Sequence, residues 1–139
     1  MSYDNNNVFA MILRGELPAH TVYEDDRTLA FMDLMPQSPG HTLVIPRAPA
    51  VDLFDLPAED LAHTMTVTQR VAQAVKTAFD PPGVMLAQLS GKAAGQTVFH
   101  VHFHIIPRWE GLQLKFHARE PEDAEVLAEH AERVRAAIS

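Results

Sequence analysis

Gly95-Gln-Thr-Val-Phe-His-Val-His-Phe-His-Ile-Ile-Pro-Arg108 is the most informative stretch of this 139-residue chain. Its three histidines, His100, His102 and His104, alternate with bulky apolar residues. An alternation of period two is typical of a β-strand, with the imidazoles on one face and the apolar side chains on the other. We therefore predict a strand over residues 97–106 whose apolar face packs on a core and whose imidazole row faces a solvated or ligand-filled surface. Because Pro107 cannot donate to a ladder, we expect the strand to weaken or end there.

Three imidazoles in a row are compatible with two kinds of chemistry. Three histidines can hold zinc and leave the fourth position open. Alternatively, one histidine can attack an electrophile while its neighbours handle protons. A surface strand that is merely rich in histidine is the remaining interpretation, and the strict alternation disfavours it.

Composition narrows the possible partners of the chain. The formal net charge is −7, the isoelectric point is near 5.5, and no run of lysine or arginine is present. Nucleic acids and anionic membranes attract basic patches, so we expect neither as a partner. There is no cysteine, which excludes disulfides and thiolate metal sites. With no apolar run long enough for a membrane span and no signal-like N-terminus, we expect a cytoplasmic protein.

The pattern of elements predicts a single α+β domain over residues 1–139 with a mainly antiparallel sheet. Asparagines precede a short apolar helix at residues 8–13, and a long stripe of apolar residues at helical spacing runs from 57 to 79. We predict strands at residues 22–24, 28–33, 41–46, 84–89 and 97–106, and helices at 8–13, 57–79 and 121–138.

His100-Val-His-Phe-His-Ile-Ile106 resembles the signature of the histidine triad family, in which histidines alternate with apolar residues. The similarity extends over about residues 7–108 and leaves 109–139 as a C-terminal extension with its helix. It implies a five-stranded, mainly antiparallel sheet with packed helices, paired as a two-fold homodimer. The supporting blocks follow the order and spacing of the nucleotide-hydrolase branch: Arg14–Pro18, Tyr23–Asp26, Leu29–Asp33, Pro39–Pro46 and Ala93–Thr97.

The resemblance implies a catalytic role for four histidines. His102 is the position of the nucleophile, and an imidazole with an ordinary pKa of about 6.5 is mostly neutral at pH 7. We expect a backbone carbonyl to hold its other nitrogen in the donor tautomer. His104 is implied to contact the phosphate and the leaving group; the transferase branch has glutamine there, so histidine favours hydrolysis. His100 is implied to orient its neighbours, and His41 to lie beside His100 and set the protonation of the network.

The nucleotide-binding residues are also carried over from the family. Asp33 is implied to accept hydrogen bonds from a ribose diol, and Gln96 and Thr97 to donate to phosphate oxygens. The expected partner is therefore a purine ribonucleotide or a nucleoside phosphoramidate. The apolar wall around the base is expected to comprise Phe9, Ile12, Leu17 and Leu34.

Two departures from the family are visible in the sequence. The family usually has two asparagines before a glycine at the end of the fourth strand, whereas this chain has Leu89-Ser90-Gly91. Loss of one such hydrogen bond costs about 0.5–1.5 kcal/mol, so we expect weaker nucleotide affinity or a different substrate with the chemistry retained. Some members hold a structural zinc ion through two cysteines and a further histidine, but Asn7, Ala10 and Pro49 occupy those positions here. We therefore expect no metal and no cofactor.

The function expected from these residues is hydrolysis of a nucleoside 5′-phosphoramidate, or of a related nucleoside phosphate ester or anhydride, through a covalent nucleotidyl-histidine. A dinucleoside polyphosphate hydrolase of the same superfamily shares the triad and remains open. A nucleotide-binding regulatory module with vestigial activity is a third interpretation, which Leu89 favours. A histidine-ligated metalloenzyme is the least favoured, because no carboxylate lies in the triad strand.

Overall fold

The computed structural model describes residues 2–113 and 120–139, and within them five strands form one antiparallel sheet in the order β1-β2-β3-β5-β4. The predicted α+β class is confirmed. Part of the C-terminal extension, residues 114–119, lies outside the described residues. The strands are β1 (Thr21–Glu24), β2 (Thr28–Met32), β3 (Thr42–Pro46), β4 (Gly83–Ala87) and β5 (Phe103–Arg108). The helices are α1 (Val8–Leu13), α2 (Ala58–Phe79), α3 (Ala124–Ala137) and the short 3-10 helix η1 (Lys92–Ala94).

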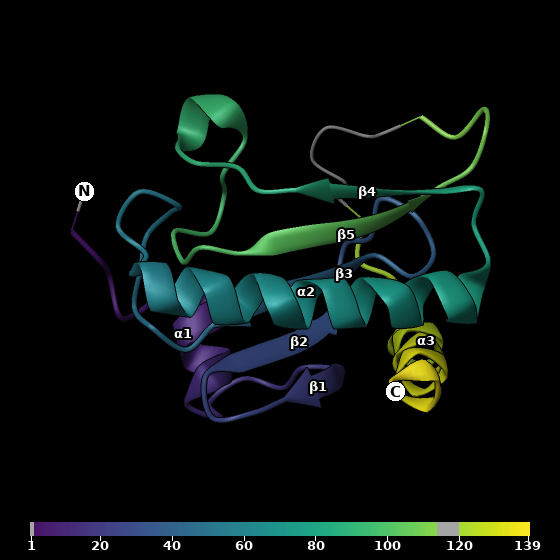
Figure 1. Cartoon of the computed structure of the whole chain (residues 1–139), viewed down its shortest axis with the longest axis horizontal. Coiled ribbons are helices and arrows are strands. Elements are labelled where there is room, and N and C mark those ends of the chain that lie inside the picture. Colours follow the sequence, from purple (N-terminus) through teal and green to yellow (C-terminus); the bar gives the residue numbers. More distant parts are fainter. Residues whose placement is uncertain (1, 114–119) are drawn as a thin grey trace.

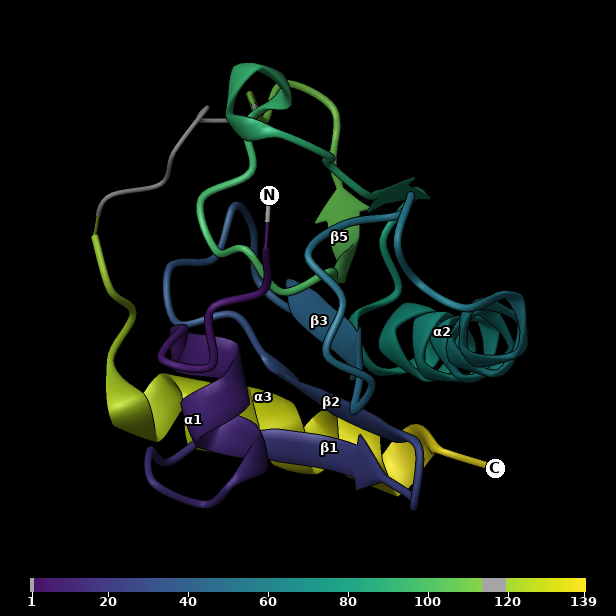
Figure 2. The same ribbon diagram turned by 90° about the vertical axis from the view of Figure 1, so that its left-hand side faces the viewer.

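The sheet is covered by helices on both faces. Helix α2 runs along one face, and α3, seen end-on, lies beneath one end of α2 and packs in the same core cluster (Figure 1). Turning the molecule shows α1 on the opposite side of the sheet from α2 (Figure 2). Among the described residues, no helix is both long enough and apolar enough to cross a bilayer. The cytoplasmic location expected from the sequence stays a prediction.

Strand β2 explains why the sheet needs helices on both faces. All five of its side chains are buried. Ala30 and Met32 pack in the cluster formed with α2 and α3, whereas Leu29 and Phe31 pack in the cluster formed with α1. Successive side chains of a strand point to opposite faces, so a strand that is apolar throughout is stable only between two covering layers.

The triad segment keeps the predicted alternation but forms a regular strand only from Phe103. Val101, Phe103 and Ile105 are buried in clusters that include residues of α2, which confirms the predicted apolar face. The ladder with β3 ends at the pair Val44–Phe103. Beyond it, the N–H of Val101 donates to the carbonyl of Ala50 at 2.9 Å. The prediction of a strand from residue 97 was therefore wrong, because the chain opposite continues through Pro46 and Pro49, which have no N–H to donate.

The expectation that the strand weakens or ends at Pro107 is confirmed as a weakening: pairing on one side is lost before Pro107, although the strand itself runs one residue further. Strand β5 continues to Arg108, and Pro107 is paired with Val84 of β4. The ladder to β3 reaches only as far as Thr42–Ile105, so Pro107 lies where β5 is paired on one side. The carbonyl of Pro107 still accepts a hydrogen bond from the Ser38 hydroxyl at 2.6 Å. A proline is tolerated at such a one-sided position, because no ladder bond from its nitrogen is needed there.

The turn before β3 depends on a glycine. Gly40 has φ +91°, and a Cβ built on it would lie 2.8 Å from the Phe79 ring. That ring is held in turn by Arg133, whose guanidinium carbon lies 4.3 Å from its centroid, and by His130, whose ring is nearly perpendicular to it with the centroids 5.0 Å apart. The ring therefore has little freedom to move aside.

We predict that Gly40→Ala lowers the free energy of unfolding by about 2–4 kcal/mol, because it combines a strained φ with overlap against Phe79. Gly15→Ala is the matched control, since Gly15 has φ +78° and no atom within 4 Å of the added Cβ. Its cost is the strain of a positive φ alone, about 1–2 kcal/mol. Urea unfolding of both variants measures the difference, and equal losses would contradict a role for Phe79.

Candidate functional site

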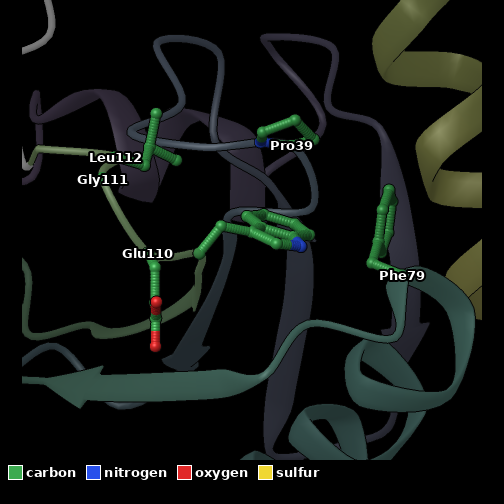
Figure 3. Close-up of a pocket in the computed structure, with 6 residues that line it drawn as sticks. Pro39, Phe79, Glu110, Gly111 and Leu112 are labelled. Atoms are coloured by element: carbon green, nitrogen blue, oxygen red, sulfur yellow. The ribbon is translucent and has the colours of Figure 1, made fainter.

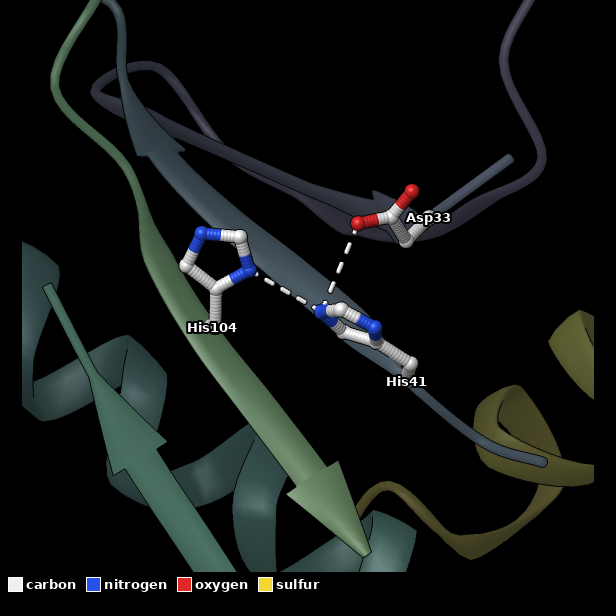
Figure 4. A group of neighbouring side chains, drawn as sticks. All are labelled: Asp33, His41 and His104. Carbon is white, nitrogen blue, oxygen red and sulfur yellow. Dashed lines mark hydrogen bonds and ion pairs between the residues drawn. The ribbon is translucent and has the colours of Figure 1, made fainter. Parts of the chain in front are cut away.

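His41 and His104 are joined directly by a hydrogen bond. His41 lies just before β3 and His104 lies in β5, and Nε2 of His41 is 2.9 Å from Nδ1 of His104 (Figure 4). The antiparallel register pairs Thr42 with Ile105, which brings His41 to the His104 end of the triad. The expectation that His41 lies beside His100 was therefore wrong.

The hydrogen-bond partners fix where the protons lie in this pair. The backbone N–H of Gln37 donates to Nδ1 of His41 at 2.9 Å, so that nitrogen is an acceptor. A neutral imidazole carries one proton, so His41 is protonated at Nε2 and donates to Nδ1 of His104. His104 in turn carries its proton on Nε2, where it can donate to a ligand.

His102 is held in the opposite tautomer. Its Nδ1 lies 2.7 Å from the carbonyl oxygen of His100, which can only accept, so Nδ1 carries the proton. This confirms the expected partner, a backbone carbonyl. Nε2 of His102 therefore has a free lone pair. The His102 ring centroid lies 4.9 Å from that of His104, so the free lone pair and the proton on His104 belong to neighbouring rings.

His100 is bonded at both ring nitrogens. Nε2 lies 2.8 Å from the carbonyl oxygen of Pro46 and must donate to it. Nδ1 lies 2.6 Å from the Tyr3 hydroxyl, which must therefore be the donor. Sequence reasoning missed Tyr3: it is 97 residues from His100, and no periodicity or motif connects the two.

The row of imidazoles is more buried than the alternation predicted. His41, His100 and His102 are buried and His104 is half-buried. Burial disfavours the charged form, and it lowers the pKa of His41 to about 3 and the pKa values of His100 and His104 to about 4. Burial also lowers the pKa of His102, while its bond to the His100 carbonyl opposes that shift. All four rings are therefore neutral at pH 7.

Asp33 follows β2 and points toward His41 (Figure 4). One carboxylate oxygen accepts from the N–H of Met35 at 2.9 Å, and the other is 3.4 Å from Nε2 of His41. Burial raises the pKa of Asp33 to about 6, an effect that the bond from Met35 opposes. Because His41 is neutral, the contact between them is no ion pair at pH 7. The carboxylate keeps lone pairs free to accept from a hydroxyl.

Asp33, His41 and His104 also offer one ligand atom each within 4.8 Å of one another. Three such groups could in principle hold a cation. However, Nδ1 of His104 is already engaged by the proton on His41 at 2.9 Å. A cation between these two nitrogens would have to displace that proton, so the arrangement fits an imidazole hydrogen bond better than a preformed metal site.

Gln96 does not present its amide to a ligand in this structure. The side chain is buried, its nitrogen donates to the carbonyls of Val51 at 2.6 Å and Val98 at 3.1 Å, and its oxygen accepts from the N–H of Gly91. Both amide hydrogens are therefore used in hydrogen bonds that hold the loop before the triad segment. The expectation that Gln96 donates to a phosphate was wrong for this conformation, because burial of an amide requires its bonds to be satisfied internally.

The other expected nucleotide-binding residues range from buried to exposed. Phe9 is buried, with its ring perpendicular to that of His102 at a centroid distance of 4.9 Å, and Ile12 packs in the same cluster as Phe9. Leu17 and Leu34 are 36% and 50% exposed, so their role as a base wall stays a prediction. Thr97 is exposed and lines a hollow with residues of the N-terminal segment, and its contact with phosphate is likewise untested.

Another surface hollow lies away from the histidines. It is lined by residues of the turn before β3, the end of α2 and the segment after β5 (Figure 3). None of the four histidines borders it, although Pro39 lies two residues before His41. It is apolar and open, and its lining comprises Pro39, Phe79, Trp109, Glu110, Gly111 and Leu112.

Comparison with known proteins agrees with this geometry. The family model described as the HIT domain matches residues 14–111, so the chain belongs to the HIT, or histidine triad, family. A crystal structure of a Hit-like protein involved in cell-cycle regulation from Bartonella henselae, solved with an unknown ligand, is 48% identical with a TM-score of 0.91. That match covers 98% of this chain and 99% of the other.

Two further relatives are more distant. The crystal structure of a hypothetical histidine triad nucleotide-binding protein from Sulfolobus tokodaii is 34% identical, with a TM-score of 0.86 and coverage of 94% of this chain and 91% of that one. An uncharacterized HIT-like protein of Mycobacterium tuberculosis is 44% identical over 107 residues, which is 77% of this chain and 74% of that protein.

The neutral histidine cluster predicts how stability depends on pH. The lowered pKa values of His41, His100 and His104 contribute stability that is fully present above about pH 6.5 and is lost as the pH falls toward 4. Asp33 acts oppositely, because its raised pKa makes the ionised folded state less stable. We expect a net loss on the order of 4 kcal/mol in the free energy of unfolding between pH 7.5 and 5.0.

Urea unfolding at the two pH values measures this loss. Asp33→Asn removes the opposing group, so the variant should lose more stability than the unsubstituted chain over the same interval. A free energy that is unchanged between pH 7.5 and 5.0 would show that the histidines are not kept neutral by folding.

Proposed function

We propose that the chain is a purine nucleotide-binding hydrolase that cleaves nucleoside 5′-phosphoramidates, or related nucleoside phosphate esters and anhydrides, through a nucleotidyl-His102 intermediate. The observation that carries the proposal is the pair of opposite tautomers on neighbouring rings. His102 has a free lone pair on Nε2, and His104 has a proton on Nε2. A nucleophile and a hydrogen-bond donor are what displacement at phosphorus requires.

The reaction takes two steps. Nε2 of His102 attacks phosphorus, a P–N bond forms, and the bond from phosphorus to the leaving group breaks. The positive charge that develops on the His102 ring is stabilised by the carbonyl of His100, which accepts from Nδ1–H. The Nε2–H of His104 gives its proton to the leaving group as that bond breaks. Water then attacks phosphorus and the P–N bond to His102 breaks, which releases the nucleoside monophosphate and neutral His102, while the proton that the water loses returns to Nε2 of His104.

Nucleotide binding is supported by the site and by a relative. The Sulfolobus tokodaii structure is of a protein named a histidine triad nucleotide-binding protein. In this chain we assign the ribose to Asp33, whose carboxylate retains free lone pairs, and the base to the apolar side chains Phe9, Ile12, Leu17 and Leu34. Thr97 remains the proposed phosphate donor, since its exposed hydroxyl borders a hollow.

The decisive experiment is single-turnover mixing with a fluorogenic adenosine phosphoramidate. We expect a burst and an acid-labile adduct in the unsubstituted chain, and a loss of at least about a thousandfold in rate for His102→Gly. His63→Gly is the control, because His63 bonds Asp25 at 2.9 Å outside the cluster and should leave the burst intact. Equal rates for the His102 variant and the unsubstituted chain would remove His102 from the mechanism.

The same assay separates the alternative functions. A dinucleoside polyphosphate hydrolase would turn over diadenosine polyphosphates faster than adenosine 5′-phosphoramidate. A regulatory module would bind AMP without turnover of either substrate. Leu89 is the residue that favours the regulatory module, because it cannot make the hydrogen bond that asparagine makes at this position in the family. The hydroxyl of the neighbouring Ser90 is already bonded to the Gln88 amide at 3.0 Å.

We also propose that the protein is a homodimer that pairs through β4. This strand is one edge of the sheet formed by the described residues, and edge strands expose unpaired N–H and C=O groups. Val84 and Leu86 alternate along it and are 38% and 49% exposed. A second copy would cover both the edge and these side chains.

Leu86→Lys tests the dimer. We expect sedimentation equilibrium to show dimer for the unsubstituted chain and monomer for the variant, because burial of an unpaired lysine at the seam is unfavourable. Val8→Lys is the control, since Val8 is 45% exposed at the start of α1, a helix that packs on β2 and β3 through Phe9. A monomer in every sample would overturn the proposed dimer. A dimer that survives Leu86→Lys would overturn the proposal that the two copies pair through β4.

A further inference from the structure

The N-terminal segment reaches directly into the histidine cluster. The hydroxyl of Tyr3 lies 2.6 Å from Nδ1 of His100, and the two rings meet edge to face at 5.6 Å with an interplanar angle of 69°. His100 is fully buried, while Tyr3 is half-buried at the surface of the domain. Tyr3 therefore connects the buried His100 ring to the surface of the domain.

The Tyr3 hydroxyl satisfies an atom that no other described group satisfies. Because Nε2 of His100 donates to the Pro46 carbonyl, Nδ1 bears a lone pair that needs a donor. A buried acceptor left without a donor is costly, so the ring would otherwise move or exchange its proton between nitrogens. With Tyr3 as donor and Pro46 as acceptor, the His100 ring is fixed at both ends.

The position of the His100 ring matters for His102 through the backbone. The carbonyl of His100 accepts from Nδ1 of His102 at 2.7 Å, and that bond leaves Nε2 of His102 unprotonated. A shift of residue 100 therefore changes the orientation and tautomer of His102. The hydroxyl of Tyr3 bonds to His100, so its hydrogen-bonded connection to His102 runs through the backbone of His100.

Hydrogen bonds connect the segment that carries Tyr3 to helix α1, which also contacts the histidine cluster. The Asp4 side chain accepts from the N–H of Asn6 at 2.9 Å, and the Asp4 carbonyl accepts from the Asn7 side chain at 2.8 Å. Asn7 then caps α1 by accepting from the N–H of Ala10 at 2.9 Å. Helix α1 places the Phe9 ring perpendicular to that of His102, with the centroids 4.9 Å apart. One turn thus sets Tyr3 on His100 and Phe9 on His102.

We propose that Tyr3 is a positioning residue for the reaction: its hydroxyl holds the His100 ring, and the His100 carbonyl thereby holds His102 with Nε2 free to attack. The chemical consequence rests on the proposed hydrolase function, whereas the effect on the ring nitrogens is independent of it. Tyr3 touches neither the substrate nor the phosphorus in this scheme.

Tyr3→Phe is the variant that tests the proposal, because it removes the hydroxyl and keeps the ring. Tyr23→Phe is the matched control, since Tyr23 is the other tyrosine of the chain and its hydroxyl donates to Asp25 at 2.9 Å in the β1–β2 hairpin. Imidazole ¹⁵N–¹H correlation spectra at pH 7.5 report the protonation and bonding of each ring nitrogen. We expect the Nδ1 signal of His100 to shift in Tyr3→Phe, and the fraction of His102 protonated at Nδ1 to fall, with neither change in Tyr23→Phe.

The kinetic readout is the single-turnover rate of adduct formation from the adenosine phosphoramidate. Loss of one hydrogen bond should slow this step roughly threefold to tenfold in Tyr3→Phe while the Kd for AMP stays unchanged. A loss of AMP binding with no change in the rate of the bound complex would mark Tyr3 as merely structural. Unchanged signals for His100 and His102 in Tyr3→Phe would overturn the proposal.

The two proposals fail in different ways. If the unsubstituted chain forms no adduct at all, the hydrolase function is wrong, and the role of Tyr3 is then decided by the ring-nitrogen spectra alone. If the adduct forms at the same rate in Tyr3→Phe, Tyr23→Phe and the unsubstituted chain, the hydrolase stands and the positioning role of Tyr3 is wrong.

Discussion

The hydrogen bond from Nδ1 of His102 to the carbonyl of His100 is the interaction on which the site depends. At 2.7 Å it leaves the nucleophilic nitrogen without a proton. The bond joins residues two apart in the chain, so it requires an extended segment whose backbone is fixed on both sides. The buried apolar side chains of Val101 and Phe103 hold one side, and the two bonds of the His100 ring hold the other. The packing of Val101 and Phe103 and the tautomer of His102 are therefore linked within a few residues.

Burial keeps these imidazoles neutral, and burial also makes each ring nitrogen costly unless it is bonded. The structure meets both demands with backbone groups of Gln37, Pro46 and His100, together with the side chains of Tyr3 and His41. At His100 these partners are the Tyr3 hydroxyl on one ring nitrogen and the Pro46 carbonyl on the other, so two neutral groups fix the orientation of the ring.

Much of the fold follows from patterns within single segments. The alternation around the triad gives the correct faces, and the stripe over 57–79 gives α2 at Ala58–Phe79. What the sequence could not provide are relations between segments. His41 was expected at His100, but the β3–β5 register places it at His104. Likewise, Gln96 has the chemistry of a phosphate donor, and only the folded loop shows that Val51 and Val98 take its two hydrogens. Tyr3 carries no local signal, because its partner is 97 residues away.

The ring of Phe79 has a wider significance than its place at the end of α2 suggests. It contacts the turn that carries His41 on one side, through the position of Gly40, and Arg133 and His130 of α3 on the other. The C-terminal helix contributes no residue to the histidine cluster, yet it supports the ring against which the His41 turn is built. The packing behind the His41 turn therefore extends into the C-terminal helix, about ninety residues further along the chain and outside the histidine signature.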